Sequence, residues 1–314
     1  MLSRIADSMF WLDRYMERSE ELLRTIRTAF ILSLDRGPAL LNGWKQILDL
    51  YSDVNESEKN KLLQDNEAML SYLILDRKNT NSLLFLLTRA RENARGMQDY
   101  ITKEVWEQVN YMYHAITQDQ IKKRMENNQP LDSVDYLLKE CLLYTGICDS
   151  TMPRGMSWCF MNLGKYLERA IFTIQLTLYQ FELRQYKLVD DTDIIYWRSL
   201  LYSLSGYEFF LKTYRSNTVS QNVIHQVILQ PQFPHSVLYA LKRIENYLEQ
   251  VIEDNNPGDD RSGLQRQFGR IVNQVECADI DYIAQEGLKP YLIRLNEQLF
   301  EFNSSLNKSF FLYS

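Results

Sequence analysis

Apolar residues recur at helical spacing along almost the whole chain. In the first segment Ile5, Met9, Leu12, Met16 and Leu23 follow one another by three, four or seven positions, so they form one stripe along a helix. Alternating, β-branched patterns typical of strands are absent from the sequence. The pattern therefore predicts an all-α fold.

Interruptions in this pattern predict where the helices begin and end. Arg36-Gly37-Pro38 should end the first helix, Thr80-Asn81-Ser82 should cap a later one at its N-terminus, and Gly146 should close another. The expected helices span 3–34, 44–51, 56–75, 83–114, 131–145, 155–188, 192–214, 219–229, 236–253 and 261 to the C-terminus.

An internal repeat is the most informative feature of the sequence. The tetrapeptide YMER at Tyr15 to Arg18 recurs as YLER at Tyr166 to Arg169, an offset of 151 residues. Further matches follow in the same order at offsets of 153 and 154: Trp44 with Trp197, Ser82 with Ser236, and Arg89 with Arg243. The sequence therefore predicts two tandem, duplicated helical bundles packed together, the first over residues 1–150 and the second over residues 151–314.

Composition and charge exclude several classes of protein. The net charge of −6 disfavours nucleic acid as a partner, because phosphate binding needs a basic surface. No uncharged stretch is both long and apolar enough to span a membrane, and the N-terminus does not resemble a signal peptide. The spacing of the four cysteines fits neither a metal site nor a disulfide framework, so we expect free, buried thiols and a cytoplasmic protein.

Standard catalytic motifs are missing from the sequence. The three histidines are scattered, and the chain has no HExxH, Walker A, GxSxG or GxGxxG motif. We therefore expect no metal at His225 or His235 and no cofactor, and the missing motifs favour a binding protein over an enzyme. Catalysis would otherwise have to come from Glu and Arg side chains.

The repeated Glu-Arg pairs, Glu17-Arg18 and Glu168-Arg169, are the first candidate site. Adjacent helical residues point about 100° apart, so neither pair can readily close on itself. Buried charges need partners, and arginine binds carboxylates through its planar fork. We expect the four residues to be largely buried in one charged network near the junction of the repeats. Whether they are structural ion pairs or hold an anionic ligand stays open.

A second candidate site is an anion pocket between helices. In the segment 86–110 the charged residues Arg91, Glu92 and Arg95 lie on adjacent ridges of one expected helix. Tyr15, Tyr166 and Trp158 would supply the walls of the pocket. Its candidate cations are Arg4, Arg89, Arg91, Arg95, Arg154 and Arg243. A solvated charged face is the alternative interpretation.

We also expect Trp11, Trp44, Trp106 and Trp197 to be mostly buried, because they lie within apolar stripes.

Four segments carry a family resemblance. They read LSRIADSMFWLDRYMERSE, RARENARGMQDYITKEVWEQVN, DSTMPRGMSWCFMNLGKYLERA and VILQPQFPHSV, and the resemblance that they carry covers essentially the whole chain. In order and content they resemble the bacterial alpha-E domain family, which takes its name from its Glu-Arg motif. One departure is that Glu245-Asn246-Tyr247 replaces Arg91-Glu92-Asn93 in the second repeat, so a site there would be asymmetric.

The resemblance implies a role in a bacterial peptide synthesis or modification system. Genes of the family usually have as neighbours those for circularly permuted ATP-grasp ligases, a transglutaminase-like protein and an Ntn-type peptidase. The resemblance therefore implies a non-catalytic helical component that binds or positions the ligase or its peptide substrate. The alternative is an unusual enzyme that uses the Glu-Arg pairs in acyl or peptide transfer.

Overall fold

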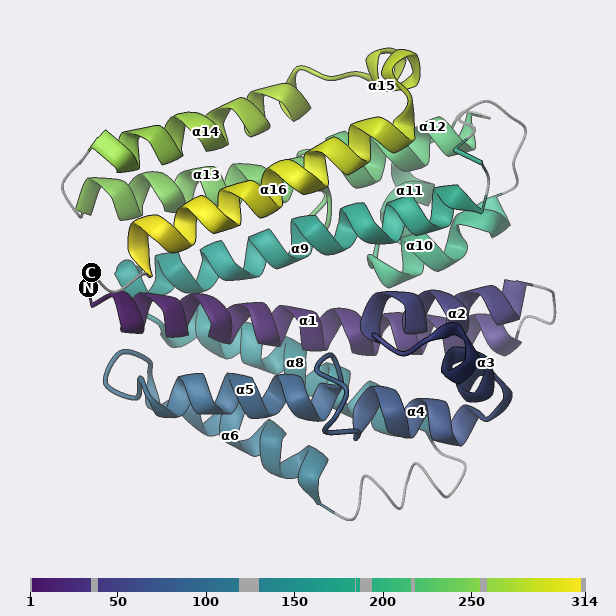
Figure 1. Cartoon of the computed structure of the whole chain (residues 1–314), viewed down its shortest axis with the longest axis horizontal. Helices are drawn as coiled ribbons and strands as arrows, with labels where there is room; N and C mark the ends of the chain where they lie inside the picture. The colour runs from purple at the N-terminus through teal and green to yellow at the C-terminus, as the bar shows by residue number, and fades with distance from the viewer. Residues whose placement is uncertain are drawn as a thin grey trace. The chain divides into compact units, whose positions relative to one another are not determined.

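The computed structural model describes residues 2–34, 39–118, 130–183, 185–186, 194–215, 218–254 and 259–311. It divides into two compact units (Figure 1). The N-terminal unit comprises residues 11–153, and the C-terminal unit comprises residues 1–10 together with 154–314. Helix α1 (Ser3–Leu34) therefore belongs to both units: its first turns pack with the C-terminal unit and the remainder with the N-terminal one.

The N-terminal unit is built on a series of packed helices. Helix α5 (Leu83–Arg95) packs on α6 (Lys103–Thr117), and α6 packs on α8 (Pro130–Thr151). Side-chain contacts tie α1 to both ends of this series: Tyr144 of α8 donates a hydrogen bond of 2.5 Å to Asp13, and Arg18 reaches the loop before α5. The short helices α2 (Ala39–Tyr51), α3 (Glu56–Gln64) and α4 (Asn66–Ile74) connect α1 to α5.

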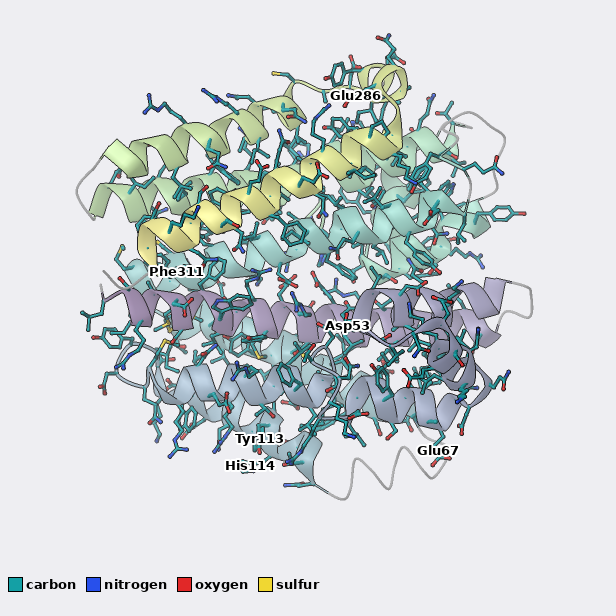
Figure 2. All side chains as sticks on the ribbon, viewed as in Figure 1. Asp53, Glu67, Tyr113, His114, Glu286 and Phe311 are labelled. Carbon is teal, nitrogen blue, oxygen red and sulfur yellow. The ribbon has the colours of Figure 1, made fainter. Side chains whose placement is uncertain are left out.

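The C-terminal unit holds a closed four-helix arrangement. Helix α9 (Met156–Glu182) packs on α13 (Val237–Asp254), α13 on α14 (Asp259–Glu276), α14 on α16 (Leu288–Phe310), and α16 on α9 again. Phe311, labelled in Figure 2, lies with its ring centroid 5.2 Å from that of Phe10 and 5.9 Å from that of Phe160. The shorter elements are η1 (Ile194–Trp197), α10 (Arg198–Ser203), α11 (Tyr207–Thr213), α12 (Val219–Ile224), the π-helical turn η2 (His225–Leu229) and α15 (Ile280–Glu286).

The predicted all-α fold is confirmed, since the described residues form helices and no strand. Over the same residues, none of the helices combines the length and the apolar character needed to cross a membrane. The first expected helix has the predicted bounds. The predicted tandem repeats 1–150 and 151–314 stay a prediction, because the two units are defined by packing alone.

Several expected helices are shorter than predicted. The segment 56–75 divides at Asp65, which ends α3 and whose carboxylate accepts from the backbone amides of Glu67 and Ala68 to cap α4. The segment 83–114 divides after Arg95, and Thr102 caps the new helix α6 by accepting from the Val105 amide. In both cases a polar side chain accepts hydrogen bonds from the first amides of the next helix, which stabilises a new helix start at that position.

The second half shows the same fragmentation. The segment 192–214 divides into η1, α10 and α11, with Gly206 capping α11, and η2 ends the segment 219–229 as a π-helical turn. The segment after 261 divides into α14, α15 and α16, because Asp279 caps α15 and Gly287 adopts φ +95°. That backbone conformation is open to glycine at little cost.

Gly146 does not end a helix, so this prediction is wrong. Helix α8 continues through it to Thr151, and Tyr144 and Cys148 on either side are both buried. Glycine inside a helix costs about 1 kcal/mol relative to alanine. Burying the large Tyr144 side chain contributes more than that, so packing overrides the local preference.

Burial of the cysteines and tryptophans follows the predictions in part. Trp44 and Trp197 are buried, whereas Trp11 and Trp106 keep part of their surface exposed. Three of the cysteines are buried, but Cys277 is exposed because it follows the last turn of α14. Amphipathic spacing places a residue near the core without fixing how completely its neighbours cover it.

Candidate functional site

The Glu-Arg motif of the N-terminal unit lies in the middle of α1. Glu17 is buried with 3% of its surface exposed, and Arg18 is half-buried. The Nη1 atom of Arg18 donates to Oδ1 of Asn81 at 3.3 Å. Asn81 precedes α5, so the motif arginine joins α1 to the loop that starts another helix of its own unit.

That loop is held by a compact set of hydrogen bonds around Ser82. Its hydroxyl donates to the carbonyl of Asp76 at 2.6 Å and accepts from the amide of Phe85 at 3.2 Å, which caps α5. Asn79 accepts from the amide of Asn81 through Oδ1 at 3.0 Å. Ser82 has no exposed surface, so water cannot replace the hydrogen bonds of its hydroxyl.

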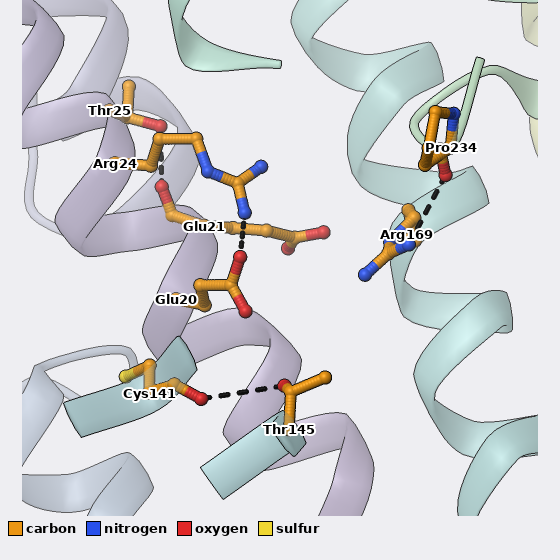
Figure 3. Close-up of polar contacts among 8 residues, drawn as sticks. All are labelled: Glu20, Glu21, Arg24, Thr25, Cys141, Thr145, Arg169 and Pro234. Carbon is orange, nitrogen blue, oxygen red and sulfur yellow. Dashed lines mark hydrogen bonds and ion pairs between the residues drawn. The ribbon is translucent and has the colours of Figure 1, made fainter. Parts of the chain in front are cut away.

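The C-terminal unit repeats this arrangement with different chemical groups. Glu168 and Arg169 are both buried, and Nη1 of Arg169 donates to the carbonyl of Pro234 at 3.2 Å, as Figure 3 shows. Ser236 donates to the carbonyl of Gln230 at 2.5 Å and accepts from the amide of Tyr239 at 3.0 Å. Each motif arginine therefore contacts the loop that precedes a serine-capped helix of its own unit.

The tyrosine of each motif faces a matching arginine. The hydrogen bond between Arg89 and Glu92 raises the pKa of Arg89 most, and the phenol of Tyr15 raises it further. In the other unit the guanidinium carbon of Arg243 lies 5.5 Å from the ring centroid of Tyr166. A third recurring contact joins Phe30 to Trp44 and Phe181 to Trp197, with centroid distances of 5.1 and 4.3 Å. These local contacts agree with the register of the predicted repeat.

A second charged cluster follows the first motif by less than one helical turn. Glu20 and Arg24 form an ion pair in which both side chains are buried, and the hydroxyl of Thr25 donates to the carbonyl of Glu21 (Figure 3). Burial raises the pKa of the nearby Cys141 thiol to about 12, although Arg24 acts in the opposite direction. Cys141 therefore stays a neutral thiol at physiological pH.

Sequence reasoning did not single out this Glu20–Arg24 pair. The i,i+4 spacing of the pair is visible in the sequence, but the same spacing is typical of exposed ion pairs on helices, which contribute little to stability. Asp13 and Tyr144 were missed for a different reason. Burial and the Asp13 carboxylate hold the pKa of Tyr144 well above its usual range, yet the two residues come from helices far apart in sequence.

The remaining arginine candidates have separate surroundings. Arg91 donates to Oδ1 of Asn110 at 2.7 Å and lies over the ring of Tyr113 at 4.7 Å, while Arg154 lies over Trp158 at 3.8 Å. Arg4 and Arg95 are exposed. Arg4, Arg154 and Arg243 belong to the C-terminal unit and Arg89, Arg91 and Arg95 to the N-terminal one. A pocket shared by all six stays a prediction, as does a network shared by both Glu-Arg pairs.

His225 and His235, which we expect to bind no metal, each take part in a hydrogen bond within the described residues. Within the described ranges, no group of three or more His, Cys, Asp or Glu side chains has the geometry to hold a metal ion. The Nδ1 atom of His225 lies 2.7 Å from the hydroxyl of Tyr214. The backbone carbonyl of His235 accepts from Thr173 at 3.0 Å.

Over the residues described, the fold and the motif define a helical protein in which the arginine of each Glu-Arg pair contacts a loop at the start of another helix. A family model named Alpha-E, described as a predicted alpha-helical domain with a conserved ER motif, matches residues 1–311. The chain belongs to the Alpha-E family. Comparison with curated proteins gave no match, and comparison with solved structures gave none either.

Proposed function

We propose that this chain is a non-catalytic helical component of a bacterial peptide or amide-bond synthesis or modification system, active in the cytoplasm. In this proposal it binds or positions a circularly permuted ATP-grasp ligase or the peptide that the ligase modifies. Membership of the Alpha-E family supports the proposal, because the resemblance that identified the family also implies these neighbours. A transglutaminase-like protein is a further candidate partner.

The hydrogen bonds of the two motif arginines are the observation that supports a non-catalytic role. Arg18 donates to Asn81 and Arg169 to Pro234, so each guanidinium holds a loop of its own unit. An arginine that must bind and release a substrate carboxylate is better left accessible than committed to a backbone carbonyl. This favours a structural brace over acyl transfer at the motif.

Complex formation with the ligase is the direct test. The purified full chain and the purified ATP-grasp ligase from the same gene neighbourhood are mixed and passed through size-exclusion chromatography with light scattering. We expect one peak with the summed mass of the two proteins. Separate elution of both the ligase and its peptide substrate from this chain would refute the proposal.

Variants at the motif separate a brace from a binding site. Arg169→Ala removes a charged hydrogen bond from a buried setting, so it should cost about 1.5–3 kcal/mol of stability. Affinity of the folded variant for the ligase should stay within twofold of the parent. A variant that melts like the parent but loses binding would place a binding site at the motif. One that melts like the parent but loses transfer activity would favour the unusual enzyme. Arg169→Lys keeps the charge without the planar fork and serves as the matched control.

A further inference from the structure

Arg89 and Arg243 occupy matching positions of the predicted repeat, but their charges are compensated differently. Arg89 is exposed and its Nη1 atom donates to Oε2 of Glu92 at 3.0 Å, which forms an ion pair along one helix face. Arg243 is half-buried on α13, and its Nη2 atom donates to the hydroxyl of Tyr247 at 2.8 Å. A neutral phenol thus stands where the other arginine has a carboxylate nearby.

Arg243 lacks an acidic partner in the part of the chain that the structure describes. Asn246 occupies the position that aligns with Glu92, and its side-chain oxygen accepts from Gln250. The nearby Glu245 pairs with Lys242 at 3.4 Å. Among the described residues, the buried Nε atom of Arg243 also has no hydrogen-bond acceptor. A partly desolvated positive charge without a counter-ion is costly unless something else supplies one.

Three tyrosines surround this guanidinium. Its carbon lies 5.5 Å from the ring centroid of Tyr166 and 5.3 Å from that of Tyr247, and these two rings stack at 6.2 Å. The ring centroid of Tyr239 lies 6.1 Å from that of Tyr166. Burial raises the pKa of Tyr239 and of Tyr247, although Arg243 acts in the opposite direction on both. The phenols of Tyr239 and Tyr247 are therefore neutral at physiological pH. A tyrosine hydroxyl can donate a hydrogen bond to an anion.

We propose that Arg243, with the hydroxyls of Tyr166, Tyr239 and Tyr247, forms a binding site for the carboxylate group of a peptide. A carboxylate carries one negative charge and two oxygens, which matches one guanidinium with neutral donors beside it. A phosphate dianion would bring a second charge that these neutral donors do not balance. Arg89 in the N-terminal unit is not such a site, because Glu92 already neutralises it.

Titration of the full chain with a small peptide tests this site independently of the ligase. The probe is N-acetyl-dialanine with a free carboxylate, and the comparison probes are its C-terminal amide and inorganic phosphate. Binding is followed by the NMR signal of the Arg243 Nε–H group. We expect saturable binding of the carboxylate peptide, at least tenfold weaker binding of the amide, and weaker binding of phosphate than of the peptide.

Matched arginine variants decide the outcome. Arg243→Gln should weaken binding of the carboxylate peptide at least tenfold, measured by calorimetry, whereas Arg89→Gln should leave it within twofold. Melting curves check that both variants fold; if Arg243→Gln does not, Tyr247→Phe replaces it and should weaken binding at least threefold. Equal binding of the acid and the amide, binding unaffected by the variants at α13, or preferred binding of phosphate would each overturn the proposal.

Discussion

The two capping serines offer a prediction whose size follows from the structure. Ser82→Ala and Ser236→Ala each remove an acceptor for a helix N-terminal amide and a donor to a backbone carbonyl six residues earlier. Loss of such a cap costs about 1 kcal/mol, and loss of the buried hydrogen bond costs about another 1 kcal/mol. Both serines are fully buried, so water cannot replace them. Each variant should therefore lose about 2 kcal/mol, close to a 30-fold change in the unfolding equilibrium.

Urea unfolding followed by circular dichroism at 222 nm measures these losses. Ser304→Ala is the control, because its hydroxyl donates to the Phe300 carbonyl on an exposed face of α16, and it should change stability by less than about 0.5 kcal/mol. The double variant Ser82→Ala/Ser236→Ala should lose about 4 kcal/mol, since each cap serves a different helix. If either single variant unfolds like the control, the capping loops do not carry the stability assigned to them.

Two further predictions concern the C-terminal unit. Gly206→Ala should destabilise the fold by about 1–3 kcal/mol, because a Cβ there would lie 2.5 Å from Nε2 of Gln226 and 2.7 Å from the Phe233 ring. Gly263→Ala in α14 has no neighbour within 4 Å and should instead stabilise by up to about 1 kcal/mol; equal urea midpoints for the two variants would contradict the packing argument. Burial lowers the pKa of His225 below 6.5, so the folded state takes up a proton less readily than the unfolded one. The stability that neutral His225 contributes should therefore be fully present above about pH 6.5 and be lost as the pH falls through the folded pKa. The urea midpoint of His225→Gln should not show this dependence on pH.

Prediction from the sequence succeeded where local spacing determines the outcome. The bounds of α1 and the capping role of Ser82 both follow from residue type and periodicity. It failed at Asp65 and Gly287, where one residue ends a helix inside a continuous apolar pattern. An aspartate or glycine inside such a pattern is compatible with either a break or a continuous helix, and tertiary packing decides between them.

The candidate site was predictable only as a set of residue types. The motif arginines were found from their repetition, but their acceptors, Asn81 and Pro234, lie more than sixty positions away in the sequence. Spacing along one helix carries no information about such partners. The asymmetry between Glu92 and Asn246 was visible in the alignment of the repeats, whereas its effect on Arg243 needed the three-dimensional surroundings of that side chain.

The division of α1 between the two units constrains the order in which the chain can fold during synthesis. Phe10 and Phe311 meet in one core although they stand near opposite ends of the described chain. On the ribosome, residues 11–153 can collapse as soon as α8 has emerged, since domains fold as units from the N-terminus. The first turns of α1 must wait with their apolar face uncovered until α16 is made. During that interval Met9 and Phe10, which the folded protein buries completely, stay exposed to solvent.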